Sequence, residues 1–138
     1  MYNFGKSSME KLKTCHEDIQ KVFNEVIRVS KIDIGISEGN RSKEMQKHYF
    51  ETGKSKVKVS KHESIPSEAV DVFAYVNGKA NYDIHNLAYI AGLVDAVSAR
   101  LYMLKEIEHK IRWGGNWNGD GEIITDQAFD DLPHFEVV

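Results

Sequence analysis

The sequence is poor in cysteine and has no long apolar run, and each absence excludes a class of protein. Cys15 is the only cysteine among the 138 residues, so an internal disulfide and a zinc–thiolate cluster are both excluded. No stretch is long and apolar enough to span a bilayer, and the first 18 residues lack the apolar run of a secretory signal. We therefore expect no membrane segment. A target outside the cytoplasm would require another protein to release this one.

Charge and composition also argue against several partners. The net charge of -3 at pH 7 gives the chain no overall attraction for nucleic acid or for an anionic membrane. Its hydrophobic content of 41% and charged content of 28% are ordinary for a soluble globular protein. The sequence contains no repeat, low-complexity tract or linker, and its length suits one core. We predict a single domain over residues 1–138, with neither nucleic acid nor membrane as a partner.

Local patterns in the first half predict two helices and a strand. Apolar residues recur at helical spacing over residues 8–29 and indicate a first amphipathic helix. Isoleucines alternate with polar residues or glycine over 32–37, which is typical of a half-buried strand. A short helix is expected from Ser42 to a stop at Gly53.

The second half adds strands and the longest helix. β-Branched and aromatic residues predict a strand at 69–76, and Asn77-Gly78 indicates a hairpin turn after it. Asp83 is expected to cap a long helix. The apolar face of that helix is predicted to comprise Leu87, Ile90, Ala91, Val94, Val97 and Leu101. Short strands are expected at 111–113 and 134–138. Without a regular βαβ rhythm, these elements favour an α+β fold with a small antiparallel sheet over a doubly wound parallel one.

Asp71 is a charged residue within an apolar run that is predicted to be a buried strand. A carboxylate there is costly unless it is paired, hydrogen-bonded or bound to a cation. His62 lies upstream and His134 opens the last predicted strand. Two imidazoles and one carboxylate from separate elements suit a three-ligand zinc site with water in the fourth position. The residues alone leave other triads open, since the chain has 6 histidines and 21 acidic residues.

The other histidines have simpler explanations. His16-Glu17-Asp18 spells the His-x-Asp of a facial-triad iron oxygenase, but positions i and i+2 of a helix do not face each other, so a surface role is favoured for His16. His48, His85 and His109 fall in predicted helices or at their ends, where solvated or capping roles are expected. The HExxH motif of another class of zinc protease is absent.

Four motifs in order resemble a known family. They are Ser60-Lys61-His62, Ala69-Val70-Asp71, Trp113-Gly114-Gly115-Asn116-Trp117 and Asp131-Leu132-Pro133-His134-Phe135-Glu136. In this combination the chain is similar, over nearly its whole length, to the L-alanyl-D-glutamate peptidases of phage endolysins. These belong with the zinc peptidases of the D-alanyl-D-alanine carboxypeptidase and dipeptidase type. The resemblance implies a small α+β domain of the zinc DD-peptidase, hedgehog-like kind, which agrees with the local patterns.

The resemblance also implies roles for individual residues. The zinc ligands of the family correspond to His62, Asp71 and His134. Its catalytic acid and base corresponds to Asp131. Its Gly-x-Arg segment corresponds to Gly39-Asn40-Arg41, which implies that Arg41 contacts the substrate or the developing oxyanion, and Ser60 is expected to bind substrate. Zinc so held would lower the pKa of its bound water towards about 7, and Asp131 would take the proton and pass one to the leaving amine.

The spacing of the first two ligands departs from the family pattern. Eight residues separate His62 from Asp71, where the family usually has six, often with a glycine among them. Pro66-Ser67 occupies the glycine region. We expect the two extra residues to form a loop, because both ligands keep their flanking sequence.

A second metal is a further hypothesis. Asn116, Asn118 and Asp120 alternate as oxygen donors as in the first half of an EF-hand loop, and Glu122 could add another. The twelfth position is Gln127 rather than glutamate. Some related endolysins are regulated by calcium at this loop, but a polar turn rich in glycine and asparagine explains the pattern equally well.

The leading interpretation is a monomeric phage endolysin that cuts the L-alanyl-D-glutamate bond of peptidoglycan stem peptides. We expect it to be made in the host cytoplasm and to act in the periplasm after release by a holin. One alternative is a D-alanyl-D-alanine carboxypeptidase with the same zinc chemistry. Another is a metal-bearing wall-binding module without catalysis, although Asp131 would have no purpose in a purely structural site.

Overall fold

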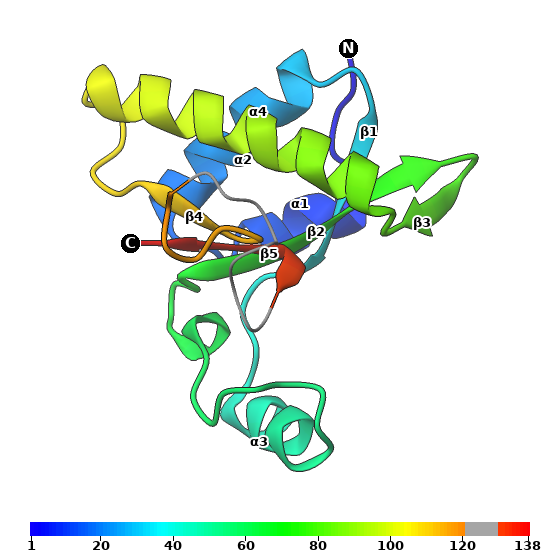
Figure 1. Ribbon diagram of the computed structural model, residues 1–138, viewed down its shortest axis with the longest axis vertical. Helices are drawn as coiled ribbons and strands as arrows, with labels where there is room; N and C mark the ends of the chain where they lie inside the picture. The colour runs from blue at the N-terminus through cyan, green and yellow to red at the C-terminus, as the bar shows by residue number, and fades with distance from the viewer. Residues whose placement is uncertain (121–129) are drawn as a thin grey trace.

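The computed structural model describes residues 1–120 and 130–138 of the chain (Figure 1). Its elements, in chain order, are α1 (Lys6–Leu12), α2 (Glu17–Val29), β1 (Asp33–Glu38), α3 (Lys43–Glu51), the 3₁₀ helix η1 (Lys61–Glu63), β2 (Ala69–Val76), β3 (Lys79–Asn81), α4 (Ile84–Met103), β4 (Ile111–Gly114) and β5 (Asp131–Val137). Among these residues, no helix is sufficiently long and apolar to cross a membrane.

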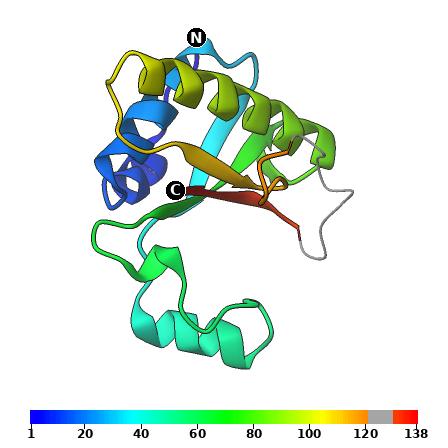
Figure 2. The same ribbon diagram turned by 60° about the vertical axis from the view of Figure 1, so that its left-hand side comes forward.

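An antiparallel sheet forms the centre of the molecule. Its strands follow the order β1-β2-β5-β4, and β3 pairs with β2 through a hairpin. Helices α2 and α4 cover one side of this sheet, while η1 and α3 lie on the other side, with α3 in a separate lobe (Figures 1 and 2). The predicted α+β class with an antiparallel sheet is confirmed.

The core lies between the sheet and the two covering helices. Phe23 of α2 and Phe135 of β5 meet edge to face, with ring centroids 5.5 Å apart. Five of the six residues predicted for the apolar face of α4 are buried, and Val97 is partly buried against the core. This packing fixes β2 and β5, the two strands that carry the polar cluster described below.

The single helix expected over residues 8–29 is wrong, because the chain forms α1 and α2 with a break between them. At the break, the amide of Ser67 donates to the carbonyl of Thr14 (2.8 Å), and the amide of His16 donates to the carbonyl of Ser67 (2.7 Å). The ring of His16 then caps α2, since its Nδ1 accepts from the amide of Asp18 (3.0 Å). Backbone bonds to a distant segment thus replace the helical bonds that the apolar spacing had suggested.

Most other predicted elements are confirmed with small shifts of their ends. The helix expected at 42–53 is α3, with Ser42 as its N-cap and Gly53 at a positive φ of 82°. Strand β2 has the predicted bounds, and Asn77 and Gly78 both adopt positive φ, as a tight hairpin turn requires. Strand β5 begins three residues before the predicted 134.

Candidate active site

Strand register brings Asp71 and His134 together. Asp71 lies directly opposite His134 in the antiparallel pair of β2 and β5, so their side chains share one face of the sheet. On the other side of β2, Asp71 lies opposite Glu38 at the end of β1. The sheet therefore places a histidine and two carboxylates in one row.

His62 reaches the same point from η1. The hydroxyl of Ser60 accepts from the amide of His62, and the carboxylate of Glu63 accepts from the amide of Ser60, which forms a capping box. The carbonyl of His62 accepts from the amide of Arg41 at 2.7 Å. These bonds fix the backbone on both sides of the ring, which is buried.

The three side chains form a compact cluster. The Nε2 atom of His62 lies 3.2 Å from Oδ1 of Asp71, and Nδ1 of His134 lies 3.1 Å from the same oxygen. The two imidazole centroids are 5.1 Å apart. One ligand atom from each residue lies within 4.8 Å of the others, so the group could hold a metal ion.

Each ring has one nitrogen that faces away from Asp71, its outer nitrogen, and the partner of this atom indicates whether a cation would fit between the rings. Nδ1 of His62 lies 2.7 Å from the carbonyl oxygen of Gly39, which can only accept, so Nδ1 donates to it and Nε2 faces Asp71. His134 faces carboxylates on both sides, since its Nε2 lies 2.8 Å from Glu136. A cation among the inner atoms would replace the protons there and take a lone pair from each inner nitrogen. Outer acceptors of this kind orient histidine ligands in metal sites, and the donor set therefore suits a metal.

The pKa values of the clustered groups depend on one another. Burial alone would raise the pKa of Asp71, but hydrogen bonds from His134 and His62 outweigh it and hold that pKa well below its usual value. Burial likewise opposes the charged form of His134, yet its bonds to Asp71 and Glu136 raise its pKa to about 9. For Glu136, burial is outweighed by His134 and Arg112, and its pKa falls to about 2. The cluster is thus built to stabilise positive charge between carboxylates.

Asp131 lies beside the cluster because β5 is irregular at its start. The pairing of β4 and β5 shifts from Trp113–Phe135 to Gly114–Asp131, and the indole of Trp113 holds the intervening carbonyl of Leu132 at 2.7 Å. Oδ2 of Asp131 is 3.9 Å from Nδ1 of His134. Burial, and next the charge of Asp71, raise the pKa of Asp131. A carboxyl with a raised pKa next to a metal-ligand set is suited to proton transfer.

Gly114 allows this approach of the two strands. A Cβ atom at that position would lie 2.0 Å from the carbonyl oxygen of Asp131. Only glycine therefore fits opposite Asp131 at this irregularity.

Arg41 lies in the interior of the site and not on the surface. Its guanidinium donates to both carboxylate oxygens of Glu38 (2.6 and 2.7 Å) and to the amide oxygen of Gln46. Its Nη2 is 3.9 Å from Oδ2 of Asp71. Three of the five N–H groups of Arg41 therefore have partners among residues 1–120 and 130–138, and the guanidinium borders the cluster of His62, Asp71 and His134.

A cleft of about 500 Å³ joins these residues. Its lining includes Arg41, Ser60, His62, Asp71, Asp131, His134, Trp117 and residues 54–57. The chain between η1 and β2, where two extra residues were expected, is an irregular loop at 64–68, and Ile65 within it is 91% exposed. The loop prediction is confirmed.

The candidate calcium loop is described only in part. Asn118 and Asp120 bond to each other through side chain and backbone (3.0 and 3.2 Å), and the carbonyl of Asn116 accepts from the amide of Gly119. Glu122 lies outside the described residues, as does the twelfth position of the EF-hand pattern.

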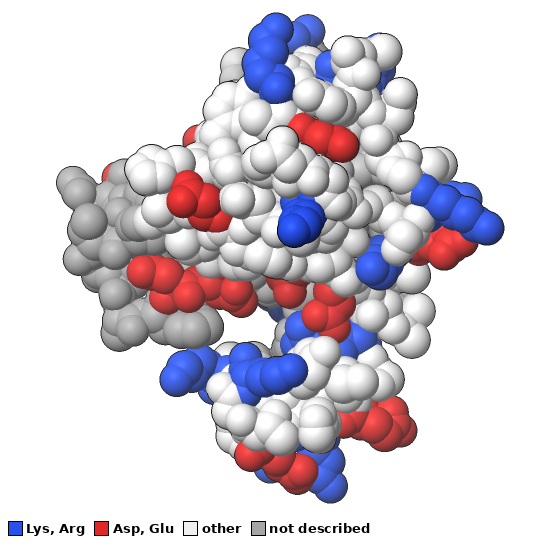
Figure 3. Space-filling model, turned by 90° about the vertical axis from the view of Figure 1, so that its right-hand side faces the viewer, with Lys and Arg blue, Asp and Glu red and all other residues white. Residues whose placement is uncertain are grey.

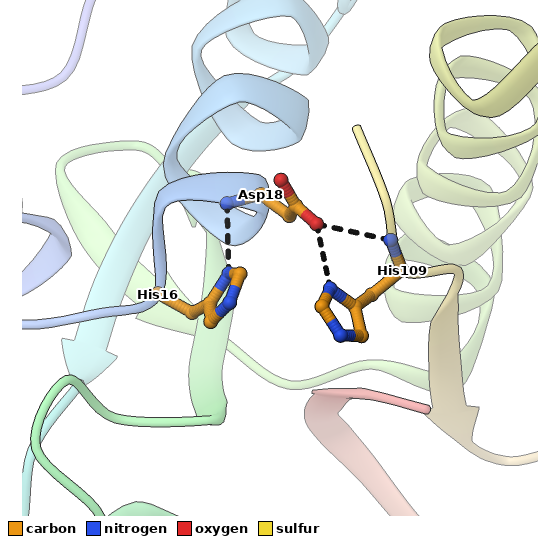
Figure 4. A group of neighbouring side chains, drawn as sticks. All are labelled: His16, Asp18 and His109. Carbon is orange, nitrogen blue, oxygen red and sulfur yellow. Dashed lines mark hydrogen bonds and ion pairs between the residues drawn. The ribbon is translucent and has the colours of Figure 1, made fainter. Parts of the chain in front are cut away.

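The other histidines lie away from the cleft. His48 and His85 are exposed, and His85 bonds to the α4 cap Asp83, as expected. His109 lies in the loop between α4 and β4, so its predicted place in or beside a helix is wrong. It contacts Asp18, and with the partly buried His16 they form a second group that could hold a metal ion (Figure 4).

Sequence reasoning missed three residues that support the cluster. Glu136 orients His134, and it is a second carboxylate in an apolar strand, so the criterion that singled out Asp71 could have found it too. Gly39 supplies a carbonyl, and Gln46 is a fully buried amide on α3. The resemblance marked Gly39 only as the start of the Gly-x-Arg segment, and nothing in the sequence marks Gln46 as a support of the site.

A family model, a phage protein and a solved structure are similar to this chain. The family model described as "Phage L-alanyl-D-glutamate peptidase" matches residues 1–138. The L-alanyl-D-glutamate peptidase of Escherichia phage T5 is 28% identical over 123 residues, covering 88% of this chain and 85% of that protein. The crystal structure of the Serratia marcescens L-Ala D-Glu endopeptidase ChiX is similar with a TM-score of 0.78 and 26% identity, covering 99% of this chain and 90% of that one. The chain therefore belongs to the phage L-alanyl-D-glutamate peptidase family.

Proposed function

We propose that this protein is a zinc-dependent endopeptidase that hydrolyses the L-alanyl-D-glutamate bond of peptidoglycan stem peptides, as a phage endolysin. The family match over residues 1–138 supports a hydrolase acting on peptidoglycan. The observation that carries the zinc chemistry is the cluster of His62, Asp71 and His134 with both imidazoles held from outside.

The donor set favours zinc among the common metals. Two imidazole nitrogens and one carboxylate oxygen, with a further position open to the cleft, form a usual catalytic zinc site. Bound there, zinc would lower the pKa of a water ligand to about 7 and polarise a carbonyl oxygen.

Asp131 is the proposed catalytic acid and base. Its carboxylate reaches the cluster at His134 and lines the cleft, so it can accept a proton from the attacking water and later donate one to the leaving amine. Its raised pKa brings it closer to the range in which both steps proceed.

Arg41 and Ser60 are proposed to act on the substrate side. Arg41 lines the cleft, and Glu38 and Gln46 hold its guanidinium in place, which suits a donor to a developing oxyanion. Ser60 lines the cleft, and its hydroxyl, which accepts from His62, can still donate to a substrate.

Mass spectrometry of purified muropeptides after digestion tests the proposed bond. The expected products carry a new amino terminus on D-glutamate and a new carboxyl terminus on L-alanine. Release of terminal D-alanine instead would identify a carboxypeptidase. The absence of any cleavage by zinc-loaded protein would leave a wall-binding module.

Calcium regulation, cellular location and oligomeric state are further parts of the proposal. Asn116, Asn118, Asp120 and Glu122 are the proposed calcium donors, and the loop leads towards Asp131 in sequence. We expect calcium to raise activity at micromolar to millimolar concentrations and Asp120→Ala to abolish the response without loss of zinc. Calorimetry that detects no calcium binding up to millimolar concentrations would exclude calcium regulation.

The protein is expected to be a monomer made in the host cytoplasm, and to reach the periplasm through a holin.

A further inference from the structure

A short basic arm, residues 54–58, forms one wall of the cleft. Lys54 and Lys56 are exposed on it and line the same cleft as the metal cluster and Asp131. Figure 3 shows this hollow between the main body and the lower lobe, with lysine and arginine side chains on the lobe margin and acidic side chains along the opposite margin. A ligand in the cleft would therefore contact cations on the lobe side.

The other cations of the cleft already have carboxylate partners. Arg41 is paired with Glu38, and Arg112 is 2.7 Å from Glu136, which also lies 3.3 Å from Lys61. Within residues 1–120 and 130–138, by contrast, no carboxylate lies at ion-pair distance from the two arm lysines. Their charges are available to an anion that enters the cleft.

Two residues of α3 hold the arm and Arg41 together. The side-chain amide of Gln46, which is fully buried, donates to the carbonyl of Val57 on the arm at 2.8 Å and accepts from Arg41. The ring of Tyr49 contacts both Lys54, at 5.5 Å, and Arg41, at 4.8 Å. The arm is thus fixed relative to the site, which lowers the entropic cost of binding through it.

The substrate of the proposed function carries an anion near the bond that is cut. A D-glutamyl residue whose amine lies in the scissile bond has two carboxyl groups. The stem peptide continues through one of them, and the other stays free and charged. We propose that Lys54 and Lys56 form a subsite that binds this free carboxylate. This inference rests on the proposed endopeptidase activity.

A pair of stem peptides that differ in one group tests the subsite. One carries the free D-glutamyl carboxylate, and in the other a carboxamide replaces it. The wild-type enzyme is expected to cut the carboxylate peptide with a kcat/KM roughly three- to tenfold higher. In the Lys54→Gln/Lys56→Gln variant the two peptides should become equal within about twofold, through a higher KM for the carboxylate peptide and an unchanged kcat.

A control variant with the same change of net charge distinguishes binding by the two arm lysines from an effect of the overall charge of the protein. The Lys43→Gln/Lys47→Gln variant removes two exposed lysines of α3 that do not line the cleft, and it should keep the wild-type preference. Equal cleavage of both peptides by the wild type, a preference retained without the arm lysines, or a preference lost in the control would each overturn the subsite. If the wild type cuts neither peptide at the L-alanyl-D-glutamyl bond, the proposed function fails and the subsite fails with it.

Discussion

Two His–Asp–His clusters in this chain have nearly the same ring geometry, but different hydrogen bonds. The imidazole centroids of His62 and His134 are 5.1 Å apart with planes at 74°. Those of His16 and His109 are 5.0 Å apart with planes at 77°. The distance and angle between the rings therefore do not by themselves favour either cluster as a metal site.

The hydrogen bonds of the second cluster already use Nδ1 of His16, Nδ1 of His109 and one oxygen of Asp18. Nδ1 of His16 accepts from the amide of Asp18, so Nε2 of the neutral ring carries the proton (Figure 4). One oxygen of Asp18 accepts from the amides of Glu108 and His109 and from Nδ1 of His109, at 2.9 to 3.0 Å. A metal on His16 Nδ1 would displace the cap of α2.

In the cleft cluster the outer nitrogen of each ring has an acceptor, Gly39 for His62 and Glu136 for His134. Both inner nitrogens face the same oxygen of Asp71. From this difference we infer that the outer hydrogen bonds favour the cleft cluster over the second one as the metal site. The second cluster instead ties the start of α2 to the loop before β4.

Replacement of a proposed zinc ligand should have the largest effect on activity, and it should show which of the two clusters binds zinc. We expect His62→Ala, Asp71→Ala and His134→Ala each to lose bound zinc and to reduce kcat/KM by roughly a thousandfold or more, because the metal supplies several kcal/mol of transition-state stabilisation. His109→Ala should keep about one zinc per chain and near wild-type activity. Metal analysis and muropeptide cleavage measure both. Zinc retained at full stoichiometry in all three ligand variants would refute the assignment.

Asp131→Asn should come next in size and should separate catalysis from metal binding. The amide is nearly the same size but cannot take the proton, so turnover should fall on the order of 10² to 10⁴ while zinc content is unchanged. The adjacent Asp130→Asn serves as the control and should stay close to wild type. Near-normal turnover by Asp131→Asn would remove this residue from the mechanism.

Glu136→Gln tests whether the hydrogen bond to the outer nitrogen of His134 supports metal binding. Both oxygens of Glu136 face donors, one from His134 and the other from Arg112 and Lys61, so an amide places an N–H group against one of them. Zinc affinity is expected to fall about 10- to 100-fold, as for other partners that orient a ligand. Competition with a chromogenic chelator measures the affinity. An unchanged affinity would mean that the outer acceptor of His134 does not matter.

Asp18→Ala should give the smallest effect on activity and a clear effect on stability. It leaves three donors without their acceptor, so the free energy of unfolding in urea should fall by about 1–3 kcal/mol, while zinc content and turnover stay within about twofold of wild type. Glu17→Ala, which removes an exposed carboxylate from the same helical turn, should change stability by less than about 1 kcal/mol. Loss of zinc from Asp18→Ala would contradict the structural role.

The stability that Asp18 contributes should also depend on pH. Burial opposes the charged form, but bonds from His109 and the amide of Glu108 lower the pKa of Asp18 below its ordinary value. A group with a lowered folded-state pKa stabilises the fold above its unfolded pKa of about 3.9 and loses that effect as the pH falls. The stability difference between wild type and Asp18→Ala should therefore be constant above about pH 5 and shrink below pH 4.

Local patterns predicted most elements of the fold but not its long-range contacts. The alternation of β2, the turn at Asn77-Gly78 and the cap at Asp83 are local features, and each is confirmed. The break between α1 and α2 depends on bonds to Ser67, more than 50 residues away in the sequence, and helical periodicity contains no information about such a bond.

The residues of the candidate site were likewise predictable from the sequence only in part. Asp71 was identifiable because a carboxylate in an apolar strand is costly, and the family motifs supplied His62, His134 and Asp131. The structure adds the partners of these residues. The interior position of Arg41 was not predictable, because it depends on Glu38 and Gln46, which are set by strand register and by the fold of the α3 lobe.

Anomalous diffraction at the zinc absorption edge tests the central claim most directly. Crystals of the wild-type protein grown with zinc should give one strong anomalous peak among His62, Asp71 and His134, and none among His16, Asp18 and His109. A peak at the second cluster, or none at the first in crystals whose protein cuts muropeptides, would contradict the account that the outer hydrogen bonds decide where the metal binds.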